Sequence, residues 1–221
     1  MHTLHPSDVT KLCKQPADYC TELGPDVTSW PTTQPLPTLP GANEAASKVS
    51  EAVKAAHETD VTAIREALVL IDQETYQKWF IVHAQNAFHF RVKAFHPKPV
   101  VTLAKSERDR PYPLARMERD VFERDGGCCQ YCGIAVHLAK DLRGVSALAP
   151  DLFPMGRTNL DRAGAMILTR SSADHIIPIS QGGKTVPANL VTACWPCQFG
   201  KNAYTPEQLG MTSPLDNVPG I

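Results

Sequence analysis

Two Cys-x-x-Cys pairs constrain the fold of this chain more than any other feature. Cys129 and Cys132 form the first pair, and Cys194 and Cys197 form the second. Four thiolates on two short turns surround a zinc ion tetrahedrally with little strain, and such a site adds folding energy to a small core. The sequence therefore predicts a structural zinc site that joins two ends of a core. Two alternatives stay open: Cys128 in place of Cys129, and four thiols without a metal.

The dipeptide Asp174-His175 lies between the two cysteine pairs and has the residue types of a hydrolytic site. Two isoleucines follow it, and Pro178 ends this apolar run, which predicts a short strand. A carboxylate is a hard ligand that suits Mg²⁺, and an imidazole accepts a proton from water near neutral pH. Adjacent residues on an ideal strand face opposite sides, so joint action on one phosphate requires a twist or a bulge.

The residues after this strand predict a turn and a supporting side chain. Gly182-Gly183 permits a tight turn. Asn189 has two interpretations, and each is sufficient on its own. It caps a short helix that begins at Leu190, or its side chain hydrogen-bonds the loop that carries His175.

Three polar residues follow at the second cysteine pair. Gln198 offers an amide oxygen as a second protein ligand for a metal. Lys201 and Asn202 come three and four residues later and share a predicted helical face with Gln198. From that face, Lys201 is expected to reach a phosphate as a point charge.

From about residue 114 to 211 the chain resembles the HNH endonucleases, the ββα-metal nucleases. The resemblance rests on the segments FERDGGCCQYCG, ADHIIPISQGG, ANLVTACWPCQFGK and YTPEQLGM. It implies that His175 is the general base, that Asn189 orients its loop, and that Asp174 holds a catalytic Mg²⁺ or Mn²⁺. Gln198 stands at the final motif position, where the family usually has His or Asn. The residues expected to contact DNA phosphates are Lys184, Lys201 and Asn202. The four cysteines resemble the structural zinc site of the family.

The N-terminal half is expected to be helical. Residues 1–41 are predicted to hold a helix over 6–23 and a proline-rich segment, which is either an extended linker or an arm laid across another surface. Residues 42–110 are predicted to form a helical domain of unknown role. Its helices begin at caps Asn43 and Asp60, and a third, with an aromatic stripe, spans about 74–95.

The C-terminal half is expected to form the nuclease domain, over residues 111–221. It has an insertion at about 134–170 that is predicted to be mostly irregular, with a strand near 165–169. The predicted fold class is therefore α+β: a helical N-terminal region followed by a ββα-metal domain with a pair of zinc knuckles.

Charge is distributed unevenly along the chain. Residues 1–74 carry 5 Lys and Arg against 11 Asp and Glu, and residues 75–124 carry 10 against 5. A basic middle segment suits a surface that faces nucleic acid, although a solvated charged face is an equal alternative. The start of the chain shows no secretory leader, and the longest clean apolar run, residues 67–71, is too short for a membrane span. A cytoplasmic protein that does not enter a membrane is predicted.

These features predict a metal-dependent endonuclease that hydrolyses DNA phosphodiester bonds. The alternative is a catalytically inactive, zinc-stabilised DNA-binding module or a subunit of a larger complex. In the latter case the acidic N-terminal part, residues 1–110, is expected to bind a protein partner.

Overall fold

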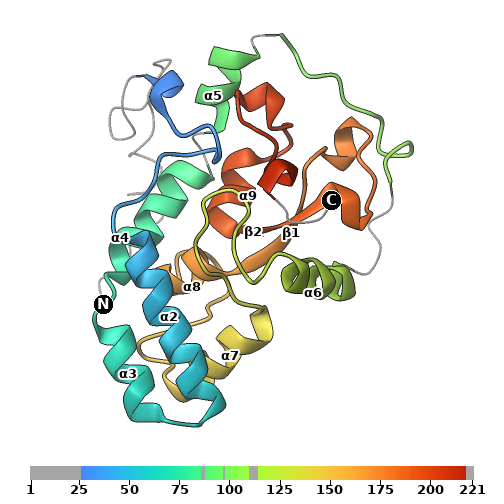
Figure 1. Cartoon of the computed structure of the whole chain (residues 1–221). Helices are drawn as coiled ribbons and strands as arrows, with labels where there is room; N and C mark the ends of the chain where they lie inside the picture. Colours follow the sequence, from blue (N-terminus) through green and yellow to red (C-terminus); the bar gives the residue numbers. More distant parts are fainter. Residues whose placement is uncertain (1–25, 86–87, 97, 110–113, 218–221) are drawn as a thin grey trace.

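A two-stranded hairpin lies at the centre of the chain, with helices on both sides (Figure 1). The computed structural model describes residues 26–85, 88–96, 98–109 and 114–217. Its main elements are α2 (Ala42–His57), α3 (Val61–Val69), α4 (Gln73–Trp79), α5 (Phe88–Phe95), α6 (Leu114–Arg124), α7 (Ala139–Leu148), α8 (Gly164–Thr169), β1 (Ser171–His175), β2 (Leu190–Cys194) and α9 (Trp195–Lys201). The predicted α+β class is confirmed.

Strands β1 and β2 pair antiparallel in a regular register, from Ser171 opposite Cys194 to His175 opposite Leu190. Every residue of β2 is buried, so a shift of register would expose an apolar face. The helix predicted to begin at Leu190 is wrong, because a strand begins there. The run LVTAC has no polar face, and its valine and threonine favour a strand that is buried on both sides.

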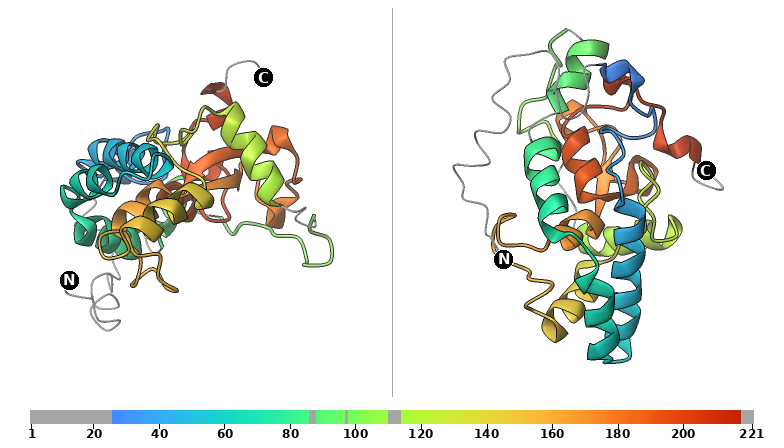
Figure 2. Two further views of the ribbon diagram at one scale, coloured as in Figure 1. Left: turned by 90° about the horizontal axis from the view of Figure 1, so that it is seen from below. Right: turned by 90° about the vertical axis from the view of Figure 1, so that its left-hand side faces the viewer.

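A layer of helices covers one side of the hairpin, and α6 covers the other (Figures 1 and 2). Helix α2 packs against α3, α7 and α8. Helix α3 begins after Asp60, whose side chain accepts a hydrogen bond from the Ala63 N–H at 3.0 Å, as predicted. The cap predicted at Asn43 is wrong, because the N-cap of α2 is Gly41.

The third helix predicted over 74–95 is interrupted. Helix α4 ends at Trp79, a π-helical turn spans Phe80–Ala84, and α5 begins at Phe88. The aromatic stripe on this segment is part of the core, since Tyr76 and Phe80 are both buried. These two rings are therefore not available to stack on bases.

The insertion at 134–170 contains two helices. The strand predicted near 165–169 is wrong, because α8 occupies this stretch and all six of its residues are buried. Periodicity cannot separate a buried helix from a buried strand in so short an apolar run. A contact distant in sequence decides it, since the Gln73 side chain of α4 accepts a hydrogen bond from the Ala165 N–H of α8 at 2.8 Å.

The proline-rich segment after residue 25 is an arm that lies against the C-terminal half. Leu36 is buried and packs on α9, where a Cβ at Gly200 would lie 2.8 Å from its Cδ1. Buried side chains form one hydrophobic cluster from Val27 in this arm to Met211. The predicted helix over 6–23 lies outside the described residues, and the domain boundaries stay a prediction.

Arg91 of α5 ties three distant segments together. Its guanidinium is 1% exposed and donates hydrogen bonds only to backbone carbonyls in the described part of the chain. These carbonyls belong to the arm and to the C-terminal region: Pro31, Gln34, Leu209 and Gly210. Burial lowers the pKa of Arg91 to about 10, so the side chain stays charged at neutral pH.

Replacement of Arg91 by Met is expected to lower the free energy of unfolding by about 3 kcal/mol or more, because each buried carbonyl left without a donor is costly. Urea denaturation measures this change. Arg65→Met is the matched control, since Arg65 is an exposed arginine paired with Asp151 and should change the midpoint little. Equal midpoints for the two variants would contradict the assigned role.

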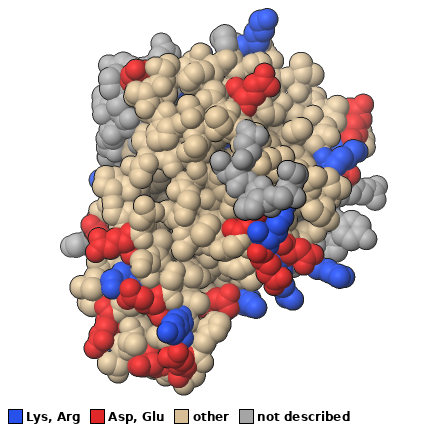
Figure 3. All heavy atoms as spheres, in the orientation of Figure 1, with Lys and Arg blue, Asp and Glu red and all other residues tan. Residues whose placement is uncertain are grey.

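Charged side chains do not gather into a patch of one sign on the face drawn in Figure 3. Acidic and basic groups mix over the ends of α2 and α3 and around α6, with a largely uncharged surface between them. The basic excess of residues 75–124 is therefore not displayed as a broad positive surface on this face. No helix among the described residues is long and apolar enough to cross a membrane.

Candidate active site

Asp174 lies on β1 with one carboxylate oxygen held from two sides. Its Oδ2 accepts a hydrogen bond of 2.7 Å from the Tyr131 hydroxyl and lies 3.2 Å from Lys201 Nζ. The residue is only 5% exposed, so these contacts offset the cost of burying a charge. Within the described part of the chain, Oδ1 has no hydrogen-bond partner, which leaves it free to bind a ligand.

An open hollow on the surface is lined by Asp174, Gln198, Phe199 and Asn202. It offers one carboxylate and two side-chain amides, and hard oxygen donors of this kind suit Mg²⁺ or Mn²⁺. Gln198 lies in the middle of α9, and Asn202 is the C-cap of this helix, with a positive φ of 53°. The donors present therefore fit a hard divalent cation that keeps several of its waters.

Lys201 differs from the expectation that it reaches a phosphate. Its side chain is 1% exposed, and Nζ donates a hydrogen bond of 2.8 Å to the His175 carbonyl. Because this ammonium also contacts Asp174 Oδ2, it balances the charge of the carboxylate and holds its orientation. The prediction was based on helical spacing alone, which does not show that this face of α9 packs against β1.

His175 ends β1 and lies beside Thr185. Its Nε2 is 3.0 Å from the Thr185 hydroxyl. Burial lowers the pKa of His175, and the charge of Asp174 acts against this effect. The imidazole is therefore neutral at physiological pH and can accept a proton. The register of β1 is regular up to this residue, so the bulge that would turn both side chains to one face is not observed.

Asn189 holds the loop that follows His175. Its Oδ1 accepts a hydrogen bond from the Ile177 N–H at 2.9 Å, and its Nδ2 donates to the carbonyls of Ile177 and Lys184, each at 2.9 Å. Of the two interpretations from the sequence, this is the second. Gly183 permits the close approach, since a Cβ there would lie 1.8 Å from the Ile177 carbonyl oxygen.

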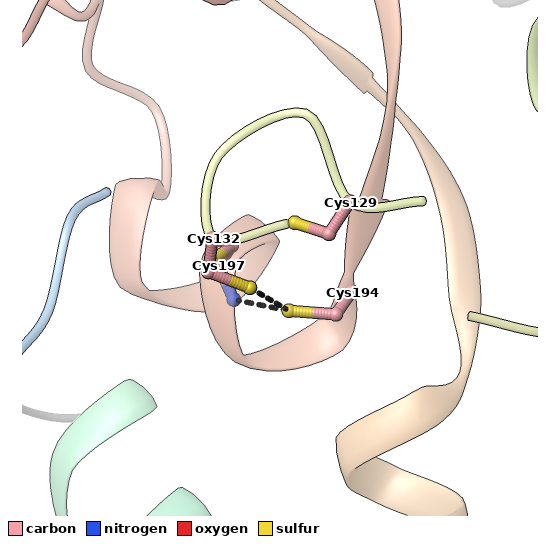
Figure 4. Close-up of side chains that lie close together, drawn as sticks. All are labelled: Cys129, Cys132, Cys194 and Cys197. Atoms are coloured by element: carbon pink, nitrogen blue, oxygen red, sulfur yellow. Dashed lines mark hydrogen bonds between the residues drawn. The ribbon is translucent and has the colours of Figure 1, made fainter. Parts of the chain in front are cut away.

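Four cysteines converge from the two predicted pairs (Figure 4). Cys129, Cys132, Cys194 and Cys197 place their sulfur atoms within 4.8 Å of one another. Cys132 Sγ and Cys194 Sγ are 3.7 Å apart, close to the ~3.8 Å edge of a tetrahedron with Zn–S bonds of ~2.3 Å. The cluster is therefore consistent with a structural zinc site. Cys128 is not part of it.

Comparison with known protein families matches residues 168–214 to the HNH endonuclease family. The matched stretch contains both strands, α9, and the residues that line the hollow. The chain carries an HNH endonuclease domain. Neither the curated proteins nor the solved structures compared with the chain give a match.

A residue upstream of the matched HNH stretch holds Asp174 in position. Tyr131 lies inside the first cysteine pair and donates the hydrogen bond that fixes Asp174. Its position between two zinc-type ligands gives it little freedom, so the cysteine cluster and the carboxylate are mechanically connected. Apart from the spacing of the cysteine pair, nothing in the sequence indicates this role of Tyr131.

A second support comes from the segment between the two halves of the chain. The Asp109 carboxylate accepts a hydrogen bond of 2.7 Å from the Thr185 N–H, and this contact lowers the pKa of Asp109. Leu103 N–H donates to the Ser180 carbonyl at 2.7 Å, so this segment runs along the loop of the HNH domain. Thr185 in turn contacts His175, a connection that the sequence did not predict.

The two remaining residues predicted to contact phosphate lie at the surface. Lys184 is exposed, and its carbonyl is held by Asn189. Asn202 is exposed at the hollow, and its Oδ1 accepts a hydrogen bond of 2.7 Å from the Ala203 N–H. Both are accessible to a ligand, in contrast to Lys201.

Proposed function

We propose that this protein is a metal-dependent endonuclease that hydrolyses DNA phosphodiester bonds. The observation that carries the proposal is the hollow beside β1 of the HNH domain, where Asp174 presents a free oxygen next to Gln198. A buried carboxylate held by a lysine and a tyrosine is costly to assemble, and a cation bound at its remaining oxygen accounts for the arrangement.

Asp174 and Gln198 are the residues that would hold Mg²⁺ or Mn²⁺ at this hollow. When bound, such an ion stabilises negative charge on the phosphate and on the leaving oxygen. Lys201 and Tyr131 both contact Asp174 Oδ2, which leaves Oδ1 for the ion. Gln198 is one methylene longer than Asn, and in this proposal its amide oxygen is the second protein ligand of the ion.

His175 is the general base of the proposed reaction. It accepts a proton from the attacking water, while Thr185 holds the other side of the ring. Because Asp174 and His175 alternate along a regular strand, the substrate phosphate has to extend from the hollow around the end of β1. Asn189 keeps that end in place by bonding to the backbone on the far side of His175.

The cysteine cluster is proposed to hold a structural zinc ion. Burial raises the pKa of the Cys194 thiol, because a buried thiolate is unfavourable unless a cation is bound beside it. Cys129, Cys132, Cys194 and Cys197 would hold this ion, and none of them lines the hollow, which separates its structural role from that of the catalytic metal.

Nicking of supercoiled plasmid by the purified protein tests the catalytic proposal. We expect nicking with Mg²⁺ or Mn²⁺ and none when divalent ions are omitted; omission is preferable to long chelation, which also removes zinc. Asp174→Asn should reduce the rate by about 10²-fold or more, because the ion loses its anionic ligand. This variant preserves the shape of the side chain beside Lys201.

Asp151→Asn is the control, since Asp151 is an exposed carboxylate paired with Arg65 far from the hollow. If the wild type binds DNA but never nicks it, the second candidate, an inactive zinc-stabilised DNA-binding module or complex subunit, is favoured. In that case Gln198 is the impaired metal ligand, and Gln198→Asn would be expected to restore nicking.

A further inference from the structure

A second hollow lies next to the proposed metal site and shares Gln198 with it. Its other lining residues come from α6, the start of β1 and the start of α9: Glu118, Arg170, Ser171, Ser172, Ala173 and Trp195. The two hollows therefore form adjacent parts of one surface, with the amide of Gln198 between them. A ligand bound in the first hollow therefore lies next to the second hollow.

Two arginines are arranged around the Trp195 ring at this hollow. The guanidinium carbons of Arg162 and Arg170 lie 5.3 and 5.9 Å from the ring centroid. The backbone N–H of Trp195 donates to the Arg170 carbonyl at 3.1 Å, which holds the start of α9 beside this arginine. A guanidinium stacked on an aromatic ring keeps its edge available for hydrogen bonds to an anion.

The positive charge of the arginines around this hollow is only partly balanced by Glu118. Burial lowers the pKa of Arg170, and the charges of Arg143 and Arg162 act in the same direction. Glu118 is the carboxylate that opposes them, and its Oε1 lies 3.7 Å from Arg170 Nη1, too far for a hydrogen bond. Nη1 is buried and has no hydrogen-bond partner in the described part of the chain.

A buried guanidinium nitrogen without an acceptor, beside two further arginines, is an unfavourable arrangement that an anion or an ordered water relieves. Arg143, Arg162 and Arg170 all belong to the insertion at 134–170. The first two precede the stretch matched to the HNH family. The electrostatic surface of this hollow is therefore a property of this chain's insertion.

We propose that the hollow at Arg170, Arg162 and Trp195 binds a backbone phosphate of the nucleic acid strand, next to the phosphate that is cleaved. The inference rests on the proposed function, because it places the second phosphate relative to the first. Arg170 lines the hollow and supplies its guanidinium, Arg162 adds charge beside it, and Trp195 packs against both. This group takes the role that the sequence had assigned to Lys201, which is buried.

DNA binding as a function of salt concentration tests this subsite without cleavage. Fluorescence anisotropy of a labelled oligonucleotide, with full-length zinc-loaded protein and no added Mg²⁺, gives the affinity and its salt dependence. Each lost phosphate contact should reduce the slope of log K against log salt by about 0.7 for a single strand or about 0.9 for a duplex. We expect this reduction for Arg170→Gln and for Arg162→Gln, with uniformly weaker binding to all sequences.

Arg170→Lys retains the charge and should restore most of the slope. Arg65→Gln removes one surface arginine far from the hollow and should leave the slope unchanged. Arg162→Gln is a second variant in case Arg170→Gln disturbs the fold, because the Arg162 guanidinium bonds only within its own loop among the described residues, to Asn159 Oδ1 and the Arg157 carbonyl. Thermal unfolding of each variant checks this directly.

The possible results test the proposed subsite and the proposed nuclease activity independently. If the wild type binds and nicks DNA while both Gln variants keep its affinity and slope, the subsite is wrong and the nuclease stands. If the slope falls in the variants but the wild type never nicks, the subsite stands and the catalytic proposal fails. No binding of DNA by the wild type overturns both.

Discussion

Replacement of His175 by Ala is expected to reduce metal-dependent nicking by about 10²- to 10⁴-fold, the contribution of a positioned general base. The ring is partly buried and its described side-chain contact is with the Thr185 hydroxyl. Its loss removes the proton acceptor but no part of the cysteine cluster or of the hollow at Asp174. The backbone carbonyl that Lys201 binds is retained in the variant.

Initial nicking rates at saturating Mg²⁺, measured beside thermal unfolding, distinguish a catalytic loss from an unfolded variant. His57→Ala is the matched control, because His57 is an exposed imidazole on α2 whose Nε2 lies 3.5 Å from Asp141. An imidazole removed at this distant position should leave the rate unchanged. A His175→Ala enzyme that nicks at the rate of the His57→Ala enzyme would disprove the assigned mechanism.

The parts of this site that the sequence predicted are those that depend on local spacing. Within each Cys-x-x-Cys pair a short turn already places the two thiols close together. The cluster therefore requires only that the fold place the two turns side by side. Asp60 as a helix cap and the short strand at Asp174 are likewise decided within a few residues. Each was found from residue types alone.

The predictions that failed depended on which side of an element is buried. At Leu190 and over 165–169 the runs are apolar on all sides, so their periodicity could not distinguish helix from strand. Lys201 has a correct position along α9, but the packing of α9 on β1 turns its ammonium inward. Helical spacing gives neighbours on one face and does not say where that face points.

Contacts between distant segments were outside the reach of the sequence altogether. Asp109 lies in a stretch that was expected only to link two halves, yet it holds the Thr185 backbone beside His175. Arg170 has no motif around it, and its free nitrogen becomes apparent only once Trp195 and Glu118 are placed. Electrostatic strain of this kind is visible only in three dimensions.

Loss of the zinc-type cluster is expected to have the largest effect on stability. Cys197→Ser removes one of four ligands, and the free energy of a structural Zn²⁺ site in a small domain is about 10 kcal/mol or more. That is comparable to the whole net stability of a typical domain, about 5–15 kcal/mol. We therefore expect the variant to contain less than one zinc ion per chain. We also expect it to lose the ordered packing around the hairpin.

The effect should extend to the hollow, because Tyr131 lies between Cys129 and Cys132 and donates the hydrogen bond that fixes Asp174. Removal of zinc from the wild type is expected to abolish nicking even when Mg²⁺ is present in excess. Restoring zinc should recover activity, and further Mg²⁺ should not. Metal content, unfolding temperature and nicking rate, measured on the same samples, show whether the three quantities change together.

Cys128→Ser is the decisive control, since Cys128 is adjacent to the cluster in sequence but its thiol points to the Gly126 carbonyl at 3.6 Å. This variant should keep its zinc, its unfolding temperature and its activity. If Cys197→Ser unfolds at the same temperature as Cys128→Ser, the four thiols contribute no metal-dependent stability. In that case Asp174 is held by Tyr131 and Lys201 alone, and the connection between the two metal sites does not exist.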